Sequence, residues 1–247
     1  MPLSPKPIPA RERLIVALDV EDTDRARRLV DELGDSVSFY KIGLGLAFDR
    51  GFWALFDHCA ARGKRTFADV KFFDVPETVK SAVRTVTRSG ASFATVHAQE
   101  AMIAAAVEGR SAAGGSPDTL KILAVTVLTS LDQGDINALG FPVNVEDLVL
   151  SRAQRVLACG ADGLISSGLE LPRLRASLGD RCLIVVPGIR PVVNKSDDDQ
   201  KRTVDIEAAF ETGADYIVVG RPIRSAPDPR AAAEAAQARI AKLFPSN

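Results

Sequence analysis

Short runs of consecutive apolar residues recur along the chain, and each is followed by a longer segment in which apolar and charged residues mix at helical spacing. Residues 13–20 form such a run, which is typical of a strand buried on both faces of a parallel sheet. Residues 22–33 then have the spacing of an amphipathic helix, and Gly34 is placed to end it. From residue 13 onward, the pattern therefore predicts an alternation of strands and helices.

Eight strands are predicted in this way, at 13–20, 39–43, 65–71, 93–98, 121–129, 163–167, 181–187 and 216–220. Helices are predicted at 22–33, 46–61, 76–89, 99–113 and 229–243. A further helix follows the long connection 130–144 and ends at residue 158, and a short helix lies between the sixth and seventh strands. Three helix-to-strand joints begin with Gly-Ala, at Gly90, Gly160 and Gly213, where glycine permits a left-handed helix stop.

Eight strand–helix units in 247 residues predict a single-domain (β/α)8 TIM barrel. Residues 13–247 would form this barrel, and the proline-rich residues 1–12 would form a flexible N-terminal arm. A doubly wound open sheet is the alternative. It usually needs fewer strands, and the glycine-rich dinucleotide loop that it carries after the first strand is missing here. The barrel is therefore the favoured architecture.

Composition excludes several classes of partner. The formal net charge of −1 argues against a nucleic acid or a membrane recognised by bulk charge, and no apolar run approaches the ~20 residues of a membrane span. The cysteines, Cys59, Cys159 and Cys182, have no metal-binding spacing and are expected as core residues in a reducing, cytoplasmic compartment. With only His58 and His97, no histidine-based metal cluster can be assembled.

The segment 67–78 concentrates charge at the end of the third strand. Because strand side chains alternate between faces, Asp69 and Lys71 are expected to point the same way. Asp74 follows in the turn before Pro76, a residue that suits the first turn of a helix. Two carboxylates would favour the charged form of Lys71, which makes it a candidate proton donor. The alternative is an ion pair that only closes the end of a strand.

In a barrel of this kind, functional groups lie at the C-terminal ends of the strands. The residues found at those ends are Asp19, Lys41, Asp69, Lys71, His97, Thr129, Ser166, Arg190, Gly220 and Arg221. Lys41, Asp69, Lys71 and Asp74 alternate in sign, so each charge would be desolvated beside an opposite one. Taken singly, Asp19 or Lys41 could equally be a surface charge that ends a strand.

The last two strands predict a phosphate site. Pro187-Gly188-Ile189-Arg190 and Gly220-Arg221 place glycines, backbone N–H groups and two guanidiniums where barrels of this kind commonly bind phosphate. The polar segment 194–202 lies in a long loop after the seventh strand. Such a loop is either a lid over the site or a surface loop, and the sequence leaves both readings open.

These motifs, in this order, resemble the orotidine 5′-phosphate decarboxylase family of the bacterial type. The resemblance runs from residue 13 to the C-terminus and rests on Ala17-Leu18-Asp19, Lys41-Ile42-Gly43, Asp69-Val70-Lys71-Phe72-Phe73-Asp74 with Thr78, Val127-Leu128-Thr129-Ser130, Pro187-Gly188-Ile189-Arg190-Pro191, Asp199-Gln200-Lys201-Arg202 and Val219-Gly220-Arg221-Pro222. Two positions depart from the family: Gln99 and Glu100 stand where it has glycines, and Val186 where threonine is common.

The resemblance implies decarboxylation of orotidine 5′-phosphate to UMP in de novo pyrimidine biosynthesis, without a cofactor or a metal. By this resemblance, Lys71 would protonate C6 and Asp69 would lie against the departing carboxylate. Lys41 and Asp74 would hold the network. Asp74, with Thr78, would come from a neighbouring subunit, which implies a homodimer. The implied substrate contacts are Asp19 and Lys41 to the ribose, Thr129 to the base, and Gly220, Arg221 and Gln200 to the phosphate, with Arg190 beside it.

Two other functions share part of the pattern. One is a Mg²⁺-dependent sugar-phosphate decarboxylase or synthase of the same barrel superfamily, such as a keto-gulonate-phosphate decarboxylase or a hexulose-phosphate synthase. The long loop with Gln200 speaks against it. The other is a non-enzymatic binder of a phosphate ligand, against which the opposed charges of Asp69, Lys71 and Asp74 speak, because a binder does not need them beside its ligand.

Overall fold

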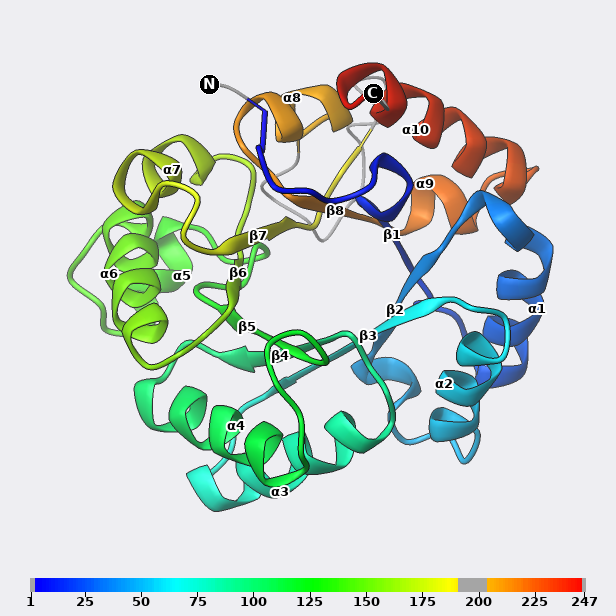
Figure 1. Ribbon diagram of the computed structural model, residues 1–247. Helices are drawn as coiled ribbons and strands as arrows, with labels where there is room; N and C mark the ends of the chain where they lie inside the picture. Colours follow the sequence, from blue (N-terminus) through cyan, green and yellow to red (C-terminus); the bar gives the residue numbers. More distant parts are fainter. Residues whose placement is uncertain (1–2, 191–203, 246–247) are drawn as a thin grey trace.

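The computed structural model describes residues 3–190 and 204–245, and it shows a closed barrel of eight parallel strands in sequential order, β1 to β8 (Figure 1). The strands are β1 Leu14–Ala17, β2 Phe39–Gly43, β3 Arg65–Phe72, β4 Phe93–His97, β5 Lys121–Val125, β6 Gly163–Ile165, β7 Leu183–Val186 and β8 Tyr216–Val219. The predicted (β/α)8 barrel is confirmed.

Helices surround the barrel and connect its strands (Figure 1). The α-helices are α1 Thr23–Leu33, α2 Phe52–Ala60, α3 Pro76–Arg88, α4 Glu100–Ala112, α5 Gln133–Ala138, α6 Val145–Ala158, α7 Leu171–Leu178, α8 Ile206–Glu211, α9 Arg221–Arg224 and α10 Pro229–Leu243. Three 3-10 turns add η1 Ala10–Glu12, η2 Gly34–Ser36 and η3 Leu44–Leu46. The sequence pattern did not predict α5, α8 or α9, because four to six residues are too few to establish a helical period.

Several strands end earlier than their apolar runs. The predicted fifth strand covers 121–129, whereas β5 ends at Val125. Beyond it, Val127 is buried, and both Val127 and Leu128 form part of a pocket wall. Apolar character predicts burial, and here the burial continues after the hydrogen-bonded ladder has ended.

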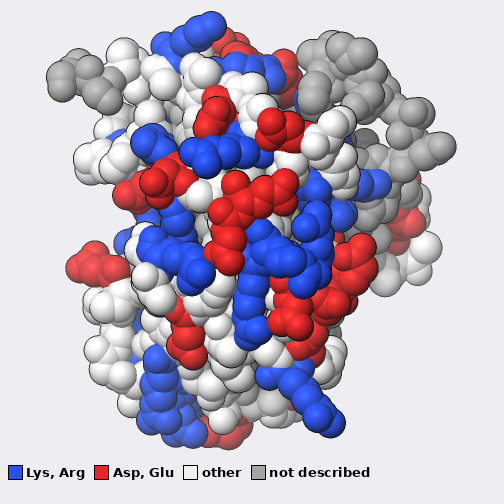
Figure 2. Space-filling model, turned by 90° about the vertical axis from the view of Figure 1, so that its right-hand side faces the viewer, with Lys and Arg blue, Asp and Glu red and all other residues white. Residues whose placement is uncertain are grey.

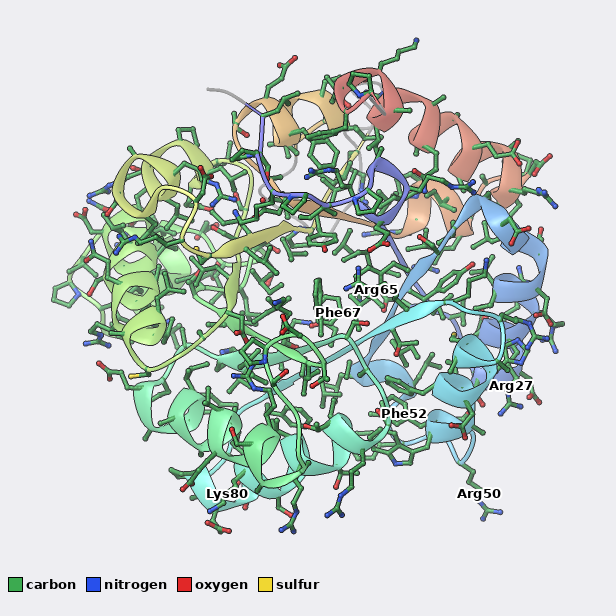
Figure 3. The ribbon with its side chains drawn as sticks, in the orientation of Figure 1. Arg27, Arg50, Phe52, Arg65, Phe67 and Lys80 are labelled. Atoms are coloured by element: carbon green, nitrogen blue, oxygen red, sulfur yellow. The ribbon has the colours of Figure 1, made fainter. Side chains whose placement is uncertain are left out.

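Alternation along the strands separates two apolar layers. One cluster fills the barrel interior and includes Phe39, Phe67, Phe93 and Tyr216, whose rings pack edge to face. The larger cluster lies between the barrel and the helices. Figure 3 shows Phe67 inside the barrel, whereas Phe52 of α2 lies in the outer layer. The interior is therefore a packed core, as expected of a barrel of eight strands.

The N-terminal end of the barrel is closed by charged and aromatic groups. The Arg65 guanidinium lies 4.4 Å from the ring centroid of Phe39 and pairs with Glu12 of η1. In the arm, Ser4 is buried and donates a hydrogen bond to Asp215, whose carboxylate also lies 3.2 Å from Lys6 Nζ. These contacts fasten residues 4–12 across the base of the barrel. The proline-rich composition had indicated only a loose arm.

The Gly-Ala joints are built alike. Gly160 and Gly213 have φ of 94° and 106°, as the helix-stop interpretation predicts. Two residues further on, Asp162 and Asp215 accept backbone N–H groups of the preceding strand, from Ile122 at 2.7 Å and from Ile184 at 2.8 Å. Each carboxylate also pairs with a helix arginine, Arg110 at 2.6 Å and Arg175 at 2.7 Å. These contacts fix the start of β6 and of β8 and connect each to an outer helix.

On the outer surface, basic and acidic side chains are interspersed. Figure 2 shows this on the face that lies at the right of Figure 1, over α1 and its neighbours, in keeping with the net charge of −1. The cysteines are free; Cys59 and Cys182 are buried and Cys159 is partly exposed. Among the described helices, none combines the length and the apolar character that crossing a membrane requires.

Candidate active site

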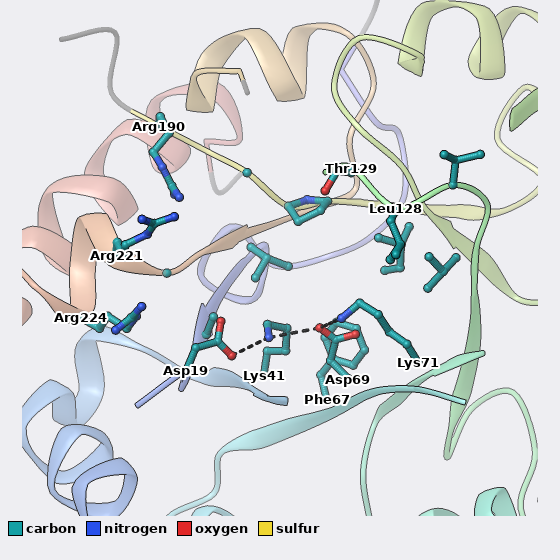
Figure 4. Close-up of a pocket in the computed structure, with 18 residues that line it drawn as sticks. Asp19, Lys41, Phe67, Asp69, Lys71, Leu128, Thr129, Arg190, Arg221 and Arg224 are labelled. Atoms are coloured by element: carbon teal, nitrogen blue, oxygen red, sulfur yellow. Dashed lines mark hydrogen bonds and ion pairs between the residues drawn. The ribbon is translucent and has the colours of Figure 1, made fainter. Parts of the chain in front are cut away.

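A pocket of about 710 Å³ opens at the C-terminal ends of the strands. It gathers most of the residues that the sequence predicts at this site: Asp19, Lys41, Asp69, Lys71, Thr129, Arg190, Gly220 and Arg221. Figure 4 shows a row of charged side chains along one side and arginines at one end. Side chains from six strand ends thus converge on one cavity, as the barrel prediction requires.

The row of charges alternates in sign across the first three strands (Figure 4). Lys41 Nζ lies 2.9 Å from Asp19 Oδ1 and 3.2 Å from Asp69 Oδ2. Lys71 Nζ lies 2.8 Å from the same oxygen of Asp69. The predicted alternation is therefore present as far as Lys71, and Asp69 is shared by two ammonium groups.

Asp69 is held in its ionised form although it is only 6% exposed. Burial alone would raise its pKa, but Lys41, Lys71 and the hydroxyl of Thr95 outweigh this and lower the pKa to about 2. For Lys41, burial acts to lower the pKa, and the carboxylates of Asp69 and Asp19 together raise it. Asp69 is therefore a buried negative charge that lies between two ammonium groups.

Lys71 adopts an unusual backbone conformation. Its φ is 54°, and among the described residues it is the one non-glycine residue with positive φ. The β3–β4 register also breaks here: Ala68 faces Ala94, but Val96 faces Phe72 instead of Val70. Such a backbone costs of order 1–3 kcal/mol and persists where the surroundings hold it. Strain at a residue that also carries the central ammonium indicates a functional position.

Thr95 of β4 holds this backbone in place. Its Oγ1 accepts a hydrogen bond from the Lys71 N–H at 3.0 Å and donates one to Asp69 Oδ1 at 2.9 Å. Thr95 is fully buried. The sequence pattern did not single out Thr95, although the alternation of strand side chains places it on the same face as His97, two residues further on.

Gly43 is required beneath the charged row. A Cβ at this position would lie 2.9 Å from Asp19 Oδ1 and 3.2 Å from Lys41 Nζ. Real Cβ contacts under 3.0 Å essentially do not occur, so any side chain would displace the Asp19–Lys41 pair. The motif Lys41-Ile42-Gly43 therefore has a steric reason.

Three guanidiniums lie at the end of the pocket away from Lys71 (Figure 4). Arg190 follows β7, and Arg221 and Arg224 belong to α9. The sequence predicted Arg190 and Arg221 here but not Arg224. Pro187 and Gly188 line the pocket as well, and Gly188 has φ of 75°, which explains the glycine in that turn.

Other predicted residues lie elsewhere. Asp74 and Thr78 are exposed and do not line the pocket of their own chain, and Asp74 Oδ1 accepts a hydrogen bond from the Val75 N–H at 2.7 Å. His97 packs against Phe73, with ring centroids 5.1 Å apart. Burial, together with Lys71 and Arg152, lowers its pKa. Ser166 is buried and does not line the pocket.

The predicted lid and possible metal ligands bear on what the pocket can bind. Gln200 and the remainder of the predicted lid, 191–203, lie outside the described residues. Within the described ranges, no group of three or more His, Cys, Asp or Glu side chains could hold a metal ion. With Lys41 and Lys71 at one end and arginines at the other, the described pocket is a candidate site for an anionic organic substrate.

Several known proteins resemble this chain in sequence and in fold. A family model described as "Orotidine 5'-phosphate decarboxylase / HUMPS family" matches residues 12–236. A protein of Methylococcus capsulatus named orotidine 5′-phosphate decarboxylase is 55% identical over 242 residues, 98% of this chain and 97% of its own length. A protein of the same name from Bradyrhizobium diazoefficiens is 47% identical over 98% of this chain and 99% of its own length. The crystal structure of orotidine 5′-phosphate decarboxylase from Lactobacillus acidophilus matches with a TM-score of 0.80 at 35% identity, covering 95% of this chain and 100% of that one.

Proposed function

We infer that this chain, which belongs to the orotidine 5′-phosphate decarboxylase / HUMPS family, converts orotidine 5′-phosphate to UMP and CO2. The observation that carries the proposal is the chain of contacts from Asp19 through Lys41 and Asp69 to Lys71, set in one pocket with arginines at its other end. A cavity of about 710 Å³ is within the range of pockets that enclose a ligand of this size.

The substrate's two anionic groups match the two cationic regions of the pocket. Arg221 and Arg190 would take the 5′-phosphate, since a guanidinium fork fits phosphate oxygens. Thr129 would face the base, and Asp19 with Lys41 would contact the ribose. This orientation brings the ring carboxylate and C6 to Asp69 and Lys71.

The reaction would proceed by direct protonation of the reacting carbon. As the bond between C6 and the carboxylate carbon breaks, CO2 departs and the electron pair remains on C6. The Lys71 ammonium stabilises that developing charge and transfers a proton to C6, which yields UMP. Lys71 then regains a proton from water. The fixed charges need no reorganisation during the step, which is the main source of electrostatic catalysis.

Asp69 would contribute by its position against the substrate carboxylate. Its pKa of about 2 keeps it ionised at neutral pH, so it would face the carboxylate as one negative charge beside another. That repulsion is relieved when CO2 leaves. Lys41 and Thr95 hold Asp69 from two other sides, so the carboxylate cannot swing away.

A homodimer with a shared site is part of the proposal. Asp74 and Thr78 would complete the pocket of the neighbouring subunit. This is supported by the surface around Asp74, because the flanking side chains Phe73 and Val75 are 67% and 63% exposed. Large apolar groups exposed beside a charged residue are typical of an interface. The free cysteines suit the reducing cytoplasm as its compartment.

The test is to supply the purified protein with orotidine 5′-phosphate and follow the pyrimidine absorbance, with UMP identified as the product. Turnover that persists in excess EDTA would separate this reaction from that of Mg²⁺-dependent sugar-phosphate enzymes. If no UMP forms at any protein concentration, the proposed function is wrong.

A further inference from the structure

Arg224 lies in the pocket close to Arg221 but has no part in the reaction described above. Figure 4 shows Arg224 below Arg221 and beside Asp19 in that view. In the proposed orientation Arg221 would meet the phosphate and Asp19 the ribose, so Arg224 would lie at the junction of the two. A cation at that junction is placed to meet an anionic group that spans it.

The backbone of α9 fixes the direction of both arginines. Residues 221 and 224 are three apart in a single helical turn and therefore share one face. Between them, Ile223 is 2% exposed and packs into the outer core. The Arg224 and Ile223 N–H groups both donate to the Gly220 carbonyl, each at 3.0 Å. With Ile223 held inward, the turn presents Arg221 and Arg224 to the pocket together.

One donor of the Arg224 guanidinium lacks a partner in the described part of the protein. Its Nε is buried and has no hydrogen-bond partner among the described residues. Buried polar atoms in native proteins are nearly always paired, so an orphaned donor in a pocket calls for a partner from a ligand. An arginine carries five N–H donors and no acceptor, so that partner is an anion or a carbonyl.

We propose that Arg224 is a further substrate-binding residue, which contacts the 5′-phosphate group together with Arg221. The inference rests on the proposed function, since it names the group of the nucleotide that Arg224 recognises. A phosphate dianion offers three oxygens, enough for more than one guanidinium. The contribution of Arg224 is expected in the selectivity for a nucleotide over its nucleoside.

The experiment measures the affinities for UMP and for uridine by calorimetry, without turnover. Arg224→Met keeps most of the aliphatic stem and removes the charge, and Arg224→Lys restores the charge without the fork. We expect Arg224→Met to weaken UMP binding by about 10- to 100-fold, the loss expected for one charge-assisted hydrogen bond. Uridine binding should stay within about twofold, and Arg224→Lys should recover part of the UMP affinity.

A matched control is Arg28→Met, which removes an exposed arginine on α1. Unchanged UMP binding in Arg224→Met would overturn the inference, and so would equal losses for UMP and uridine, because Arg224 would then act on the fold or on the base. The two proposals fail separately. A wild-type protein that binds UMP through Arg224 but releases no CO2 from orotidine 5′-phosphate contradicts only the proposed decarboxylation.

Discussion

The Thr95 hydroxyl donates a hydrogen bond to Asp69 Oδ1 at 2.9 Å, and Thr95 Oγ1 accepts one from the Lys71 backbone N–H at 3.0 Å. One buried hydroxyl thus orients the carboxylate and holds the left-handed backbone of the neighbouring lysine. This contact links two residues of β3 to an adjacent strand at the point where their own ladder is broken. Removing it should affect the chemistry more than the fold.

Thr95→Val is expected to lower turnover by about 10- to 100-fold, because it removes a hydrogen bond to a charged group and leaves the Lys71 N–H unpaired. Thr95→Ser keeps the hydroxyl and should retain most of the activity. Steady-state rates of both variants check this. If the two variants lost activity equally, the methyl group and its packing would be the cause.

Lys71→Ala should abolish turnover while the protein remains folded, since no other described ammonium lies on this side of Asp69. A loss of at least about 100-fold is expected, the lower end of what a general acid contributes. The matched control is Lys80→Ala on α3, which removes a surface lysine paired with Glu108 at 3.1 Å. A smaller loss at Lys71 would exclude it as the proton donor.

Gly43→Ala should reduce kcat/KM by about 10- to 100-fold, because the new methyl group would displace the carboxylate of Asp19 from Lys41. Gly45→Ala is the matched control, because a Cβ there would meet nothing within 4 Å. Thermal unfolding verifies that both variants fold. Full activity in Gly43→Ala would show that the Asp19–Lys41 contact is dispensable.

Asp69 makes stability depend on pH at the acid end. Its pKa is 3.8 ordinarily and about 2 in the folded protein, so the folded state binds this proton less readily than the unfolded chain. Its contribution, about 2 kcal/mol, is complete above pH ~4 and is lost as the pH falls toward 2. The free energies of unfolding of the wild type and of Asp69→Asn, obtained from urea unfolding between pH 2 and 6, measure this contribution. We expect wild-type stability relative to the variant to fall with pH, and a constant difference would contradict this.

The proposed shared site predicts complementation between inactive chains. Lys71→Ala and Asp74→Ala should each be nearly inactive alone. Random exchange makes half of the dimers mixed, and one of the two sites in each mixed dimer is intact, so roughly a quarter of wild-type activity should return. The two variants are refolded together, and mass spectrometry verifies the mixed dimers. Mixed dimers without recovered activity would show that Asp74 serves its own chain.

Much of the fold was predictable because buried strands and amphipathic helices differ in period. The inward phase of Asp69 and Lys71 also followed from the period of two. The left-handed φ of Lys71 did not, because it depends on the hydrogen bond that the Lys71 N–H donates to Thr95 on another strand. Arg224 was missed for a different reason: a four-residue helix leaves no periodic signal, so nothing in the sequence aims its side chain at the pocket.

The aromatic filling of the barrel interior has a consequence for the movement of the gas that the reaction would release. Phe67 lines the pocket at its inner end. Beyond Phe67, the described interior is filled by the rings of Phe39, Phe93 and Tyr216, and the Arg65 guanidinium lies over the Phe39 ring. The described interior is therefore filled below the pocket. In the proposed reaction, CO2 would leave from the same C-terminal face of the barrel at which the nucleotide enters, and not through the barrel to its N-terminal end.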